Sequence, residues 1–164
     1  MDSSDRPINI EHKSKFMTSF QTAIAEQDRN LAVVRELFSE LAKGNMSVLD
    51  KLVAEDYVQH SIMGVPQGRD GVRRFFQEFA TAFPDLHIEI EDMAADGDRV
   101  FLRGTMSGTW QGEYLGQKPN GKKFRVVEFD EFRLGNGIII EHWDALDTGS
   151  LARQLGFSSH RQVD

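Results

Sequence analysis

Two carboxylic acids occupy positions where an alternating segment otherwise predicts buried apolar side chains. In the expected strand 124–134 every second residue lies on one face, and Glu128 and Asp130 share that face with Phe124, Val126 and Phe132. Burying an ionised carboxylate without a partner is costly, so each acid must be paired, protonated or directed into a cavity. A carboxyl group in an apolar cavity binds its proton more tightly and can exchange it with a ligand. We therefore interpret Asp130 as a general acid/base and Glu128 as the group that supports it.

Two structural alternatives stay open for these acids. An arginine such as Arg103 could pair with one of them, or one could cap a backbone group. A β-bulge could also reverse which face of the strand is buried.

The turn at Asn136-Gly137 decides which residues stand opposite Asp130. The pair is typical of a two-residue hairpin turn. In that register Glu141 and Trp143 face inward with Asp130, and His142 faces the other side. A three-residue turn would instead set His142 against Asp130, as a pair suited to acid–base chemistry. We expect the two-residue turn, with His142 on the outer face.

Several further residues are candidates for the wall of a cavity. His60 precedes a glycine-rich loop and could orient a ligand carbonyl, or it could hydrogen-bond to the backbone. Trp110 is the last residue of its expected strand, and its side chain could either line the cavity or fill the core. An aromatic row on one side of the helix expected over 70–83 is predicted to line the cavity, and it consists of Phe75, Phe79 and Phe83.

The order of the expected elements predicts an α+β fold. Helices are expected over 28–43, 47–53 and 70–83, strands over 87–95, 99–110, 124–134 and 138–147, and a last helix over 149–155. Asp28 could cap the first helix, and Asp96-Gly97 is a second hairpin turn. Helices followed by an antiparallel meander predict a curved sheet wrapped on the N-terminal helices, which makes a cone with an interior. We divide the chain into an arm (1–27), a cone-shaped domain (28–157) and a polar tail (158–164).

The arm carries a short apolar stripe if it is helical. Phe16, Phe20 and Ile24 recur at a spacing of four residues. Such an arm could dock on a neighbouring subunit, or it could be a frayed terminus. We expect a homodimer.

Composition narrows the function classes. The 164 residues carry a net charge of −7, which disfavours nucleic acid as a partner, and contain no cysteine. Neither a membrane-spanning apolar run nor the apolar core of a secretory signal is visible, so we expect a cytoplasmic protein. His142 with Asp144 and Asp147 offers two metal ligands on one strand face without an identifiable third, and phosphate-binding motifs are absent. We expect no metal and no cofactor.

With these residues in place, the chain resembles the SnoaL-like polyketide cyclase family, within the nuclear-transport-factor-2-like fold. The resemblance covers residues 30–156, and the stretches that carry it are 56–60, 68–71, 82–85, 108–113, 116–122, 130–133 and 139–147. It implies a cofactor-free cavity enzyme in which an aspartate, matched here by Asp130, moves a proton during aldol ring closure of a polyketide ester. His60 and Trp143 match pocket positions. The chain departs from the family at Trp110, where members commonly carry a histidine, and Glu128 or His60 could replace that imidazole.

These observations predict a cyclase or isomerase that acts on an apolar, carbonyl-bearing, polyketide-like metabolite in an enclosed cavity. The catalytic residues expected are Asp130, Glu128 and His60. The substrate-binding residues expected are Trp110, Trp143, Glu141, Phe75, Phe79, Phe83 and Phe132. The alternative is a non-catalytic domain of the same fold that binds small molecules or mediates association.

Overall fold

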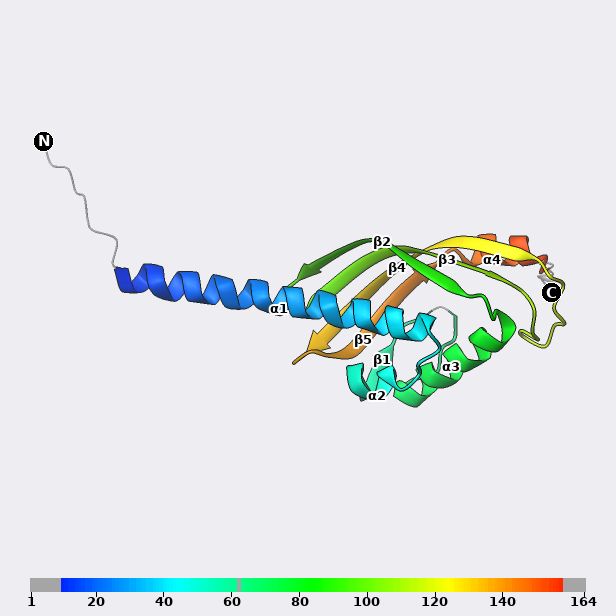
Figure 1. Cartoon of the computed structure of the whole chain (residues 1–164), viewed down its shortest axis with the longest axis horizontal. Coiled ribbons are helices and arrows are strands. Elements are labelled where there is room, and N and C mark those ends of the chain that lie inside the picture. The colour runs from blue at the N-terminus through cyan, green and yellow to red at the C-terminus, as the bar shows by residue number, and fades with distance from the viewer. Residues whose placement is uncertain (1–9, 62, 158–164) are drawn as a thin grey trace, which may run out of the picture.

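The structure is a computed structural model, and it describes residues 10–61 and 63–157, with side chains from Lys15 onward. Its elements are α1 (Ile10–Ala42), α2 (Val48–Leu52), β1 (Val53–Gln59), α3 (Arg69–Ala82), β2 (His87–Asp96), β3 (Arg99–Thr109), β4 (Lys123–Gly135), β5 (Ile138–Leu146) and α4 (Thr148–Leu155). The five strands form one curved sheet in the order β1-β5-β4-β3-β2, and α1, α2 and α3 lie on its concave side (Figure 1). The predicted α+β fold is confirmed.

Strand β1 joins the sheet by parallel pairing with β5, whereas the other neighbours are antiparallel. The segment around residues 56–60 is too short for its period to reveal a strand. Its pairing places Gln59 beside His142 at the edge of the sheet. Gln59 and His142 can therefore contact each other across the two strands.

Helix α1 begins far before the position expected from the sequence. Asp28 does not cap it, because the helix already runs from Ile10. No glycine or proline interrupts residues 10–42, and an aspartate inside a helix costs at most about 0.7 kcal/mol relative to alanine. The second half of α1 packs on the sheet through buried residues such as Val34 and Leu37, and the first half projects beyond the sheet (Figure 1).

The two hairpins follow their turn residues. Gly135 pairs with Ile138, so Asn136-Gly137 is the expected two-residue turn, and both residues have the positive φ that a type I′ turn requires. In the first hairpin Asp96 pairs with Arg99. The loop residues there are therefore 97 and 98, one position later than expected, since Gly97 takes the positive φ.

A bulge in β5 reverses the faces that the turn alone would set. Leu134 pairs with Ile139, but the preceding residue Arg133 pairs with Glu141, so Ile140 is an extra residue on β5. Every residue of β5 after Ile140 therefore lies on the face opposite to the one expected from a regular hairpin.

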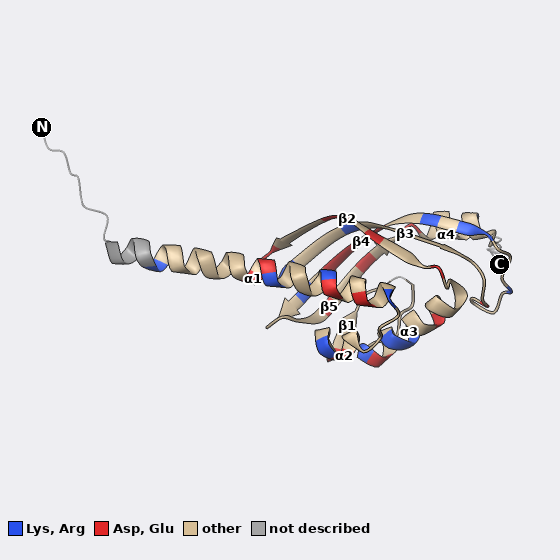
Figure 2. Cartoon of the chain, viewed as in Figure 1, with Lys and Arg blue, Asp and Glu red and all other residues tan. Residues whose placement is uncertain are grey.

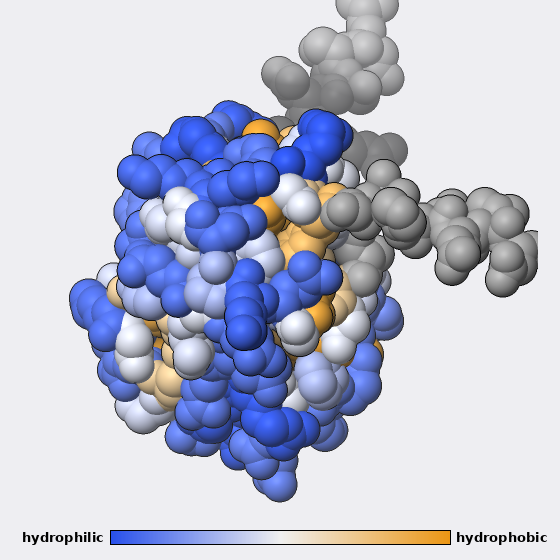
Figure 3. Space-filling model, turned by 90° about the vertical axis from the view of Figure 1, so that its right-hand side faces the viewer, coloured by the Kyte–Doolittle hydropathy of each residue, from blue (hydrophilic) through white to orange (hydrophobic). Residues whose placement is uncertain are grey.

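The core consists of two clusters of buried side chains. One joins α1 and α2 to the sheet around Leu49 and Ile139, and the other joins α3 and α4 around Phe83 and Leu155. The end of the molecule that carries α4 is mostly hydrophilic, and its apolar residues gather mainly in a narrow strip (Figure 3). In the described part of the chain no helix is long and apolar enough to cross a membrane.

Candidate functional site

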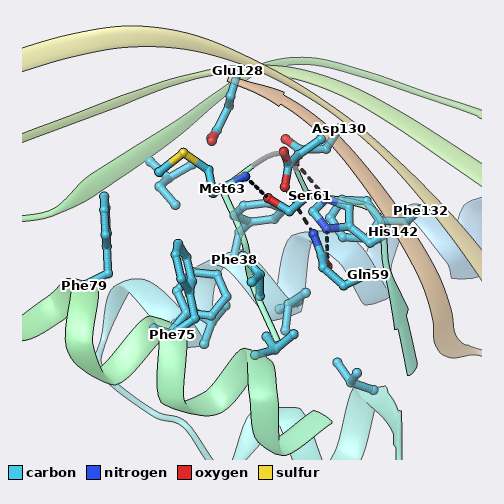
Figure 4. A pocket seen from close by; sticks show the side chains of 18 of the residues that line it. Phe38, Gln59, Ser61, Met63, Phe75, Phe79, Glu128, Asp130, Phe132 and His142 are labelled. Carbon is cyan, nitrogen blue, oxygen red and sulfur yellow. Dashed lines mark hydrogen bonds and ion pairs between the residues drawn. The ribbon is translucent and has the colours of Figure 1, made fainter. Parts of the chain in front are cut away.

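An apolar cavity lies between the concave face of the sheet and helices α1 and α3. The space open to the centre of a water-sized sphere is about 100 Å³. Most of its wall is aliphatic or aromatic, and the polar exceptions are Tyr57, Gln59, Ser61, Glu128, Asp130, His142 and Asp144. Within the described residues neither lysine nor arginine lines it. Glu128 and Asp130 extend from the sheet toward the cavity, opposite Phe75 and Phe79 of α3 (Figure 4).

Asp130 lies in this wall with one oxygen held and the other free of protein partners. Its side chain is buried, and Oδ1 lies 2.8 Å from Nε2 of His142. Oδ2 is also buried, and no donor among the described residues reaches it. Arg103 pairs with Glu91 and not with Asp130, which removes the arginine alternative. Asp130 itself lines the cavity, so Oδ2 is the oxygen of this residue that still lacks a partner among the described residues.

His142 is oriented through Gln59. The imidazole Nδ1 lies 3.0 Å from Gln59 Oε1, the Tyr57 hydroxyl donates to the same oxygen, and Gln59 Nε2 donates to Asp144 Oδ2 at 3.1 Å. The carboxylate of Asp144 needs a donor, so the amide of Gln59 points its NH₂ group there and its oxygen toward His142. His142 therefore carries a proton on Nδ1, and Nε2 shares a second proton with Asp130. Phe132 holds the ring from the side, stacked at 4.2 Å between centroids.

Burial makes the two inward carboxyl groups of β4, those of Glu128 and Asp130, weaker acids than usual. It raises the pKa of Asp130, and the hydrogen bond with His142 opposes this rise. Burial raises the pKa of Glu128 to about 8, and the negative charges of Asp130 and Asp144 add to the effect. At neutral pH Glu128 is therefore largely protonated and, as a residue of the cavity wall, can donate a hydrogen bond to a ligand. Its Oε1 is buried and has no partner among the described residues.

The sequence profile of the SnoaL-like polyketide cyclase family matches residues 32–155. The chain belongs to this family. Comparison with curated proteins finds no match.

Solved structures of similar proteins share the fold over nearly their whole length. TsrD from Streptomyces laurentii is 28% identical, with a TM-score of 0.72 over 79% of this chain and 96% of that chain. IdmH from Streptomyces antibioticus, a candidate polyketide cyclase, is 28% identical, with a TM-score of 0.70 over 77% and 98%. AclR from Streptomyces galilaeus, a candidate hydroxylase, is 30% identical, with a TM-score of 0.71 over 79% and 97%.

In this SnoaL-like protein the cavity brings together five of the residues singled out from the sequence. They are Glu128, Asp130, Phe75, Phe79 and Phe132. The inward orientation expected for Glu128 and Asp130 is confirmed by their burial.

The expectation that Glu141 and Trp143 face inward is wrong, because the bulge at Ile140 turns them to the outer face. Glu141 accepts hydrogen bonds there from Arg133 and His60. His60 lies on the same outer side, half-exposed and stacked on Trp143 at 4.6 Å between centroids. None of these three lines the cavity.

Trp110 and Phe83 are core residues rather than cavity wall. Trp110 is buried in the cluster of α3 and α4, where its Nε1 donates to the Gly112 carbonyl at 2.7 Å. Phe83 is fully buried in the same cluster. A histidine at position 110 would therefore not stand in this cavity wall either.

The residues that the sequence alone did not place in the site are His142, Gln59, Tyr57 and Asp144. His142 was expected on the outer face, and the same bulge that removes Trp143 brings it inward. Gln59 and Tyr57 depend on the parallel pairing of β1, for which a seven-residue strand offers little periodic signal. Among the described residues no group of three or more His, Asp or Glu side chains is placed to hold a metal ion.

Proposed function

We propose that this chain is a cofactor-free enzyme of the cyclase or isomerase type, with an uncharged, apolar, carbonyl-bearing metabolite as its substrate. The observation that carries the proposal is Asp130 in the wall of an apolar cavity, where His142 holds Oδ1 and the buried Oδ2 has no partner among the described residues. A carboxylate in an apolar cavity, held in place by a neighbouring imidazole, is suited to removing a proton from carbon.

The proposed reaction begins with His142 protonated and Asp130 ionised. Asp130 Oδ2 takes the proton from the carbon next to the ligand carbonyl, and the electron pair of the broken C–H bond moves onto the carbonyl oxygen. Protonated Glu128 donates a hydrogen bond to that oxygen as negative charge develops there. The enolate carbon then attacks a second carbonyl to close a ring, and the alkoxide formed from that carbonyl takes the proton back from Asp130. Alternatively, the proton returns at another carbon to give an isomer.

The size of the cavity bears on the substrate. Pockets for drug-sized ligands measure roughly 300–1,000 Å³, whereas this cavity measures about 100 Å³. A single ring fits the space as it stands. A polyketide of several rings requires wall side chains to move, and Met63, whose unbranched chain reaches the cavity (Figure 4), is the most adaptable of them.

The experiment uses cyclohexanone as a probe and follows hydrogen–deuterium exchange next to its carbonyl by NMR. We expect the wild type to accelerate exchange and Asp130→Asn to lose about 100-fold or more of that rate while still binding the probe. Asp56→Asn, on an exposed position of β1, serves as the control and should exchange like the wild type. Binding without exchange by the wild type would instead favour the non-catalytic binding domain.

We also propose that the protein is a homodimer and that it is cytoplasmic.

A further inference from the structure

The exposed large apolar side chains of the described chain fall mainly into two groups. One is the arm, defined here as residues 15–26 of α1, with Phe16, Met17, Phe20 and Ile24 between 44% and 70% exposed. The other is the outer patch, defined here as Phe101, Val127 and Phe129 on the convex face of the sheet, between 41% and 53% exposed. Leu115, in the loop before β4, and Val58, on the edge strand β1, belong to neither.

The outer patch is continuous across two strands. On neighbouring strands Phe129 pairs with Arg103, and Phe101 lies two residues before Arg103, so the two phenylalanines are diagonal neighbours. Val127 lies two residues before Phe129 on β4 and shares its face. The arginines beside the patch are already paired on this chain, Arg103 with Glu91 and Arg99 with Glu131. A surface that docks here therefore need not supply charges of its own.

The arm has the matching properties. From Phe16 to Ala25 it carries no charged residue (Figure 2), and every side chain from Lys15 to Glu26 is exposed. Its apolar stripe resumes on the same side of the helix seven residues after Ile24, at Leu31, and continues through Val34 and Phe38 in or against the core. The apolar side of the arm is thus on the same side of α1 as the residues that pack on the sheet. The arm itself projects past the end of the sheet, so the described part of this chain does not cover it.

From this juxtaposition we propose that the arm of one chain docks on the outer patch of a second copy, and the second arm on the first patch. The exchange is symmetric, so it closes as a dimer. It covers both apolar groups, whereas pairing the two arms leaves the patches exposed and pairing the two patches leaves the arms exposed. A fully exposed phenylalanine offers roughly 150–250 Å², and the four phenylalanines of one contact are between 41% and 70% exposed. They therefore contribute roughly 330–550 Å² per contact, and with Met17, Ile24 and Val127 two contacts approach the roughly 1,200 Å² of a small specific interface. The proposal is independent of the chemistry proposed for the cavity.

Association is measured on the full chain by sedimentation velocity over a concentration series. We expect Phe20→Glu and Phe129→Glu each to raise the dimer dissociation constant about tenfold or more. Leu115→Glu, which also places a charge at an exposed apolar position, should leave it unchanged. Loss of association in only one of the first two variants, or a wild type that stays monomeric throughout the series, overturns the proposal.

Cross-linking then tests the contact itself. The chain has no cysteine of its own, so a thiol reagent reacts only with the introduced residues. A mixture of Met17→Cys and Val127→Cys chains should form a cross-linked dimer with a short bismaleimide, and neither variant alone should. Cross-linking of Met17→Cys by itself would show arm-to-arm pairing, and cross-linking of Val127→Cys by itself would show patch-to-patch pairing. Either result contradicts the reciprocal exchange.

Discussion

Gln59 Oε1 lies 3.0 Å from His142 Nδ1, across the parallel pair of β1 and β5, and this contact decides which imidazole nitrogen faces Asp130. A strand that pairs at the edge of the sheet thereby controls a proton shared within the cavity wall. The same glutamine also holds Tyr57 and Asp144. One side chain thus orients three polar groups of the site.

Replacing Gln59 by leucine should therefore destabilise the fold as well as the site. Gln59→Leu leaves the Tyr57 hydroxyl, His142 Nδ1 and an oxygen of Asp144 without their partner, and each buried unsatisfied group costs about 1–3 kcal/mol. We expect the free energy of unfolding, measured with urea, to fall by about 3 kcal/mol. Gln111→Leu, at an exposed position, is the matched control. Equal stability of the two variants would contradict the network.

The pKa of Glu128, raised by burial to about 8, makes stability fall as the pH rises. A free glutamate has a pKa of about 4.3, so between pH 4.3 and 8 the folded chain binds this proton more tightly than the unfolded chain does. That contribution is complete below pH 4.3 and is lost as the pH rises through 8. Glu128→Gln removes this contribution. Between pH 5 and 8.5 the free energy of unfolding of the variant should therefore fall by a few kcal/mol less than that of the wild type.

Urea unfolding across this pH range provides the measurement for Glu128. Glu55→Gln changes an exposed glutamate of β1 and should follow the wild-type curve. Parallel curves for Glu128→Gln and the wild type would show that Glu128 ionises in the folded chain as it does in water.

Local sequence patterns were sufficient for most helices and strands and for the inward face of β4. They were insufficient for strand β1, for the start of α1 and for the partner of Asp130. Alternation predicts burial of Glu128 and Asp130, and Asn136-Gly137 predicts its own turn, because both depend on neighbours along the chain. The bulge at Ile140 depends on how β5 meets both β4 and β1. The bulge lies in a run of three isoleucines, and nothing in that run distinguishes the bulged residue. The faces expected for His142 and Trp143 are therefore reversed in the structure.

The charge of the cavity wall predicts which ligands it accepts. Glu128, Asp130 and Asp144 face it, His142 is the only basic side chain among the described residues that line it, and an anionic ligand would meet no lysine or arginine. Cyclohexanone should therefore bind at least about tenfold more tightly than cyclohexanecarboxylate at pH 7.5. Ligand-detected NMR titration measures both affinities. Asp144→Asn should narrow the difference, and equal binding of the two probes to the wild type would refute this selectivity.

The adaptable part of the wall predicts how a larger ligand could enter. Met63 lines the cavity from the loop after β1, and its truncation leaves only the Cβ atom in that space. Met63→Ala should therefore favour 2-decalone, a ketone with two rings, over cyclohexanone by about tenfold relative to the wild type. Met93→Ala truncates a methionine of β2 that does not line the cavity, so it should leave the preference unchanged. If Met63→Ala behaves like Met93→Ala, the cavity does not open at Met63, and a polyketide of several rings must enter by displacing another part of the wall.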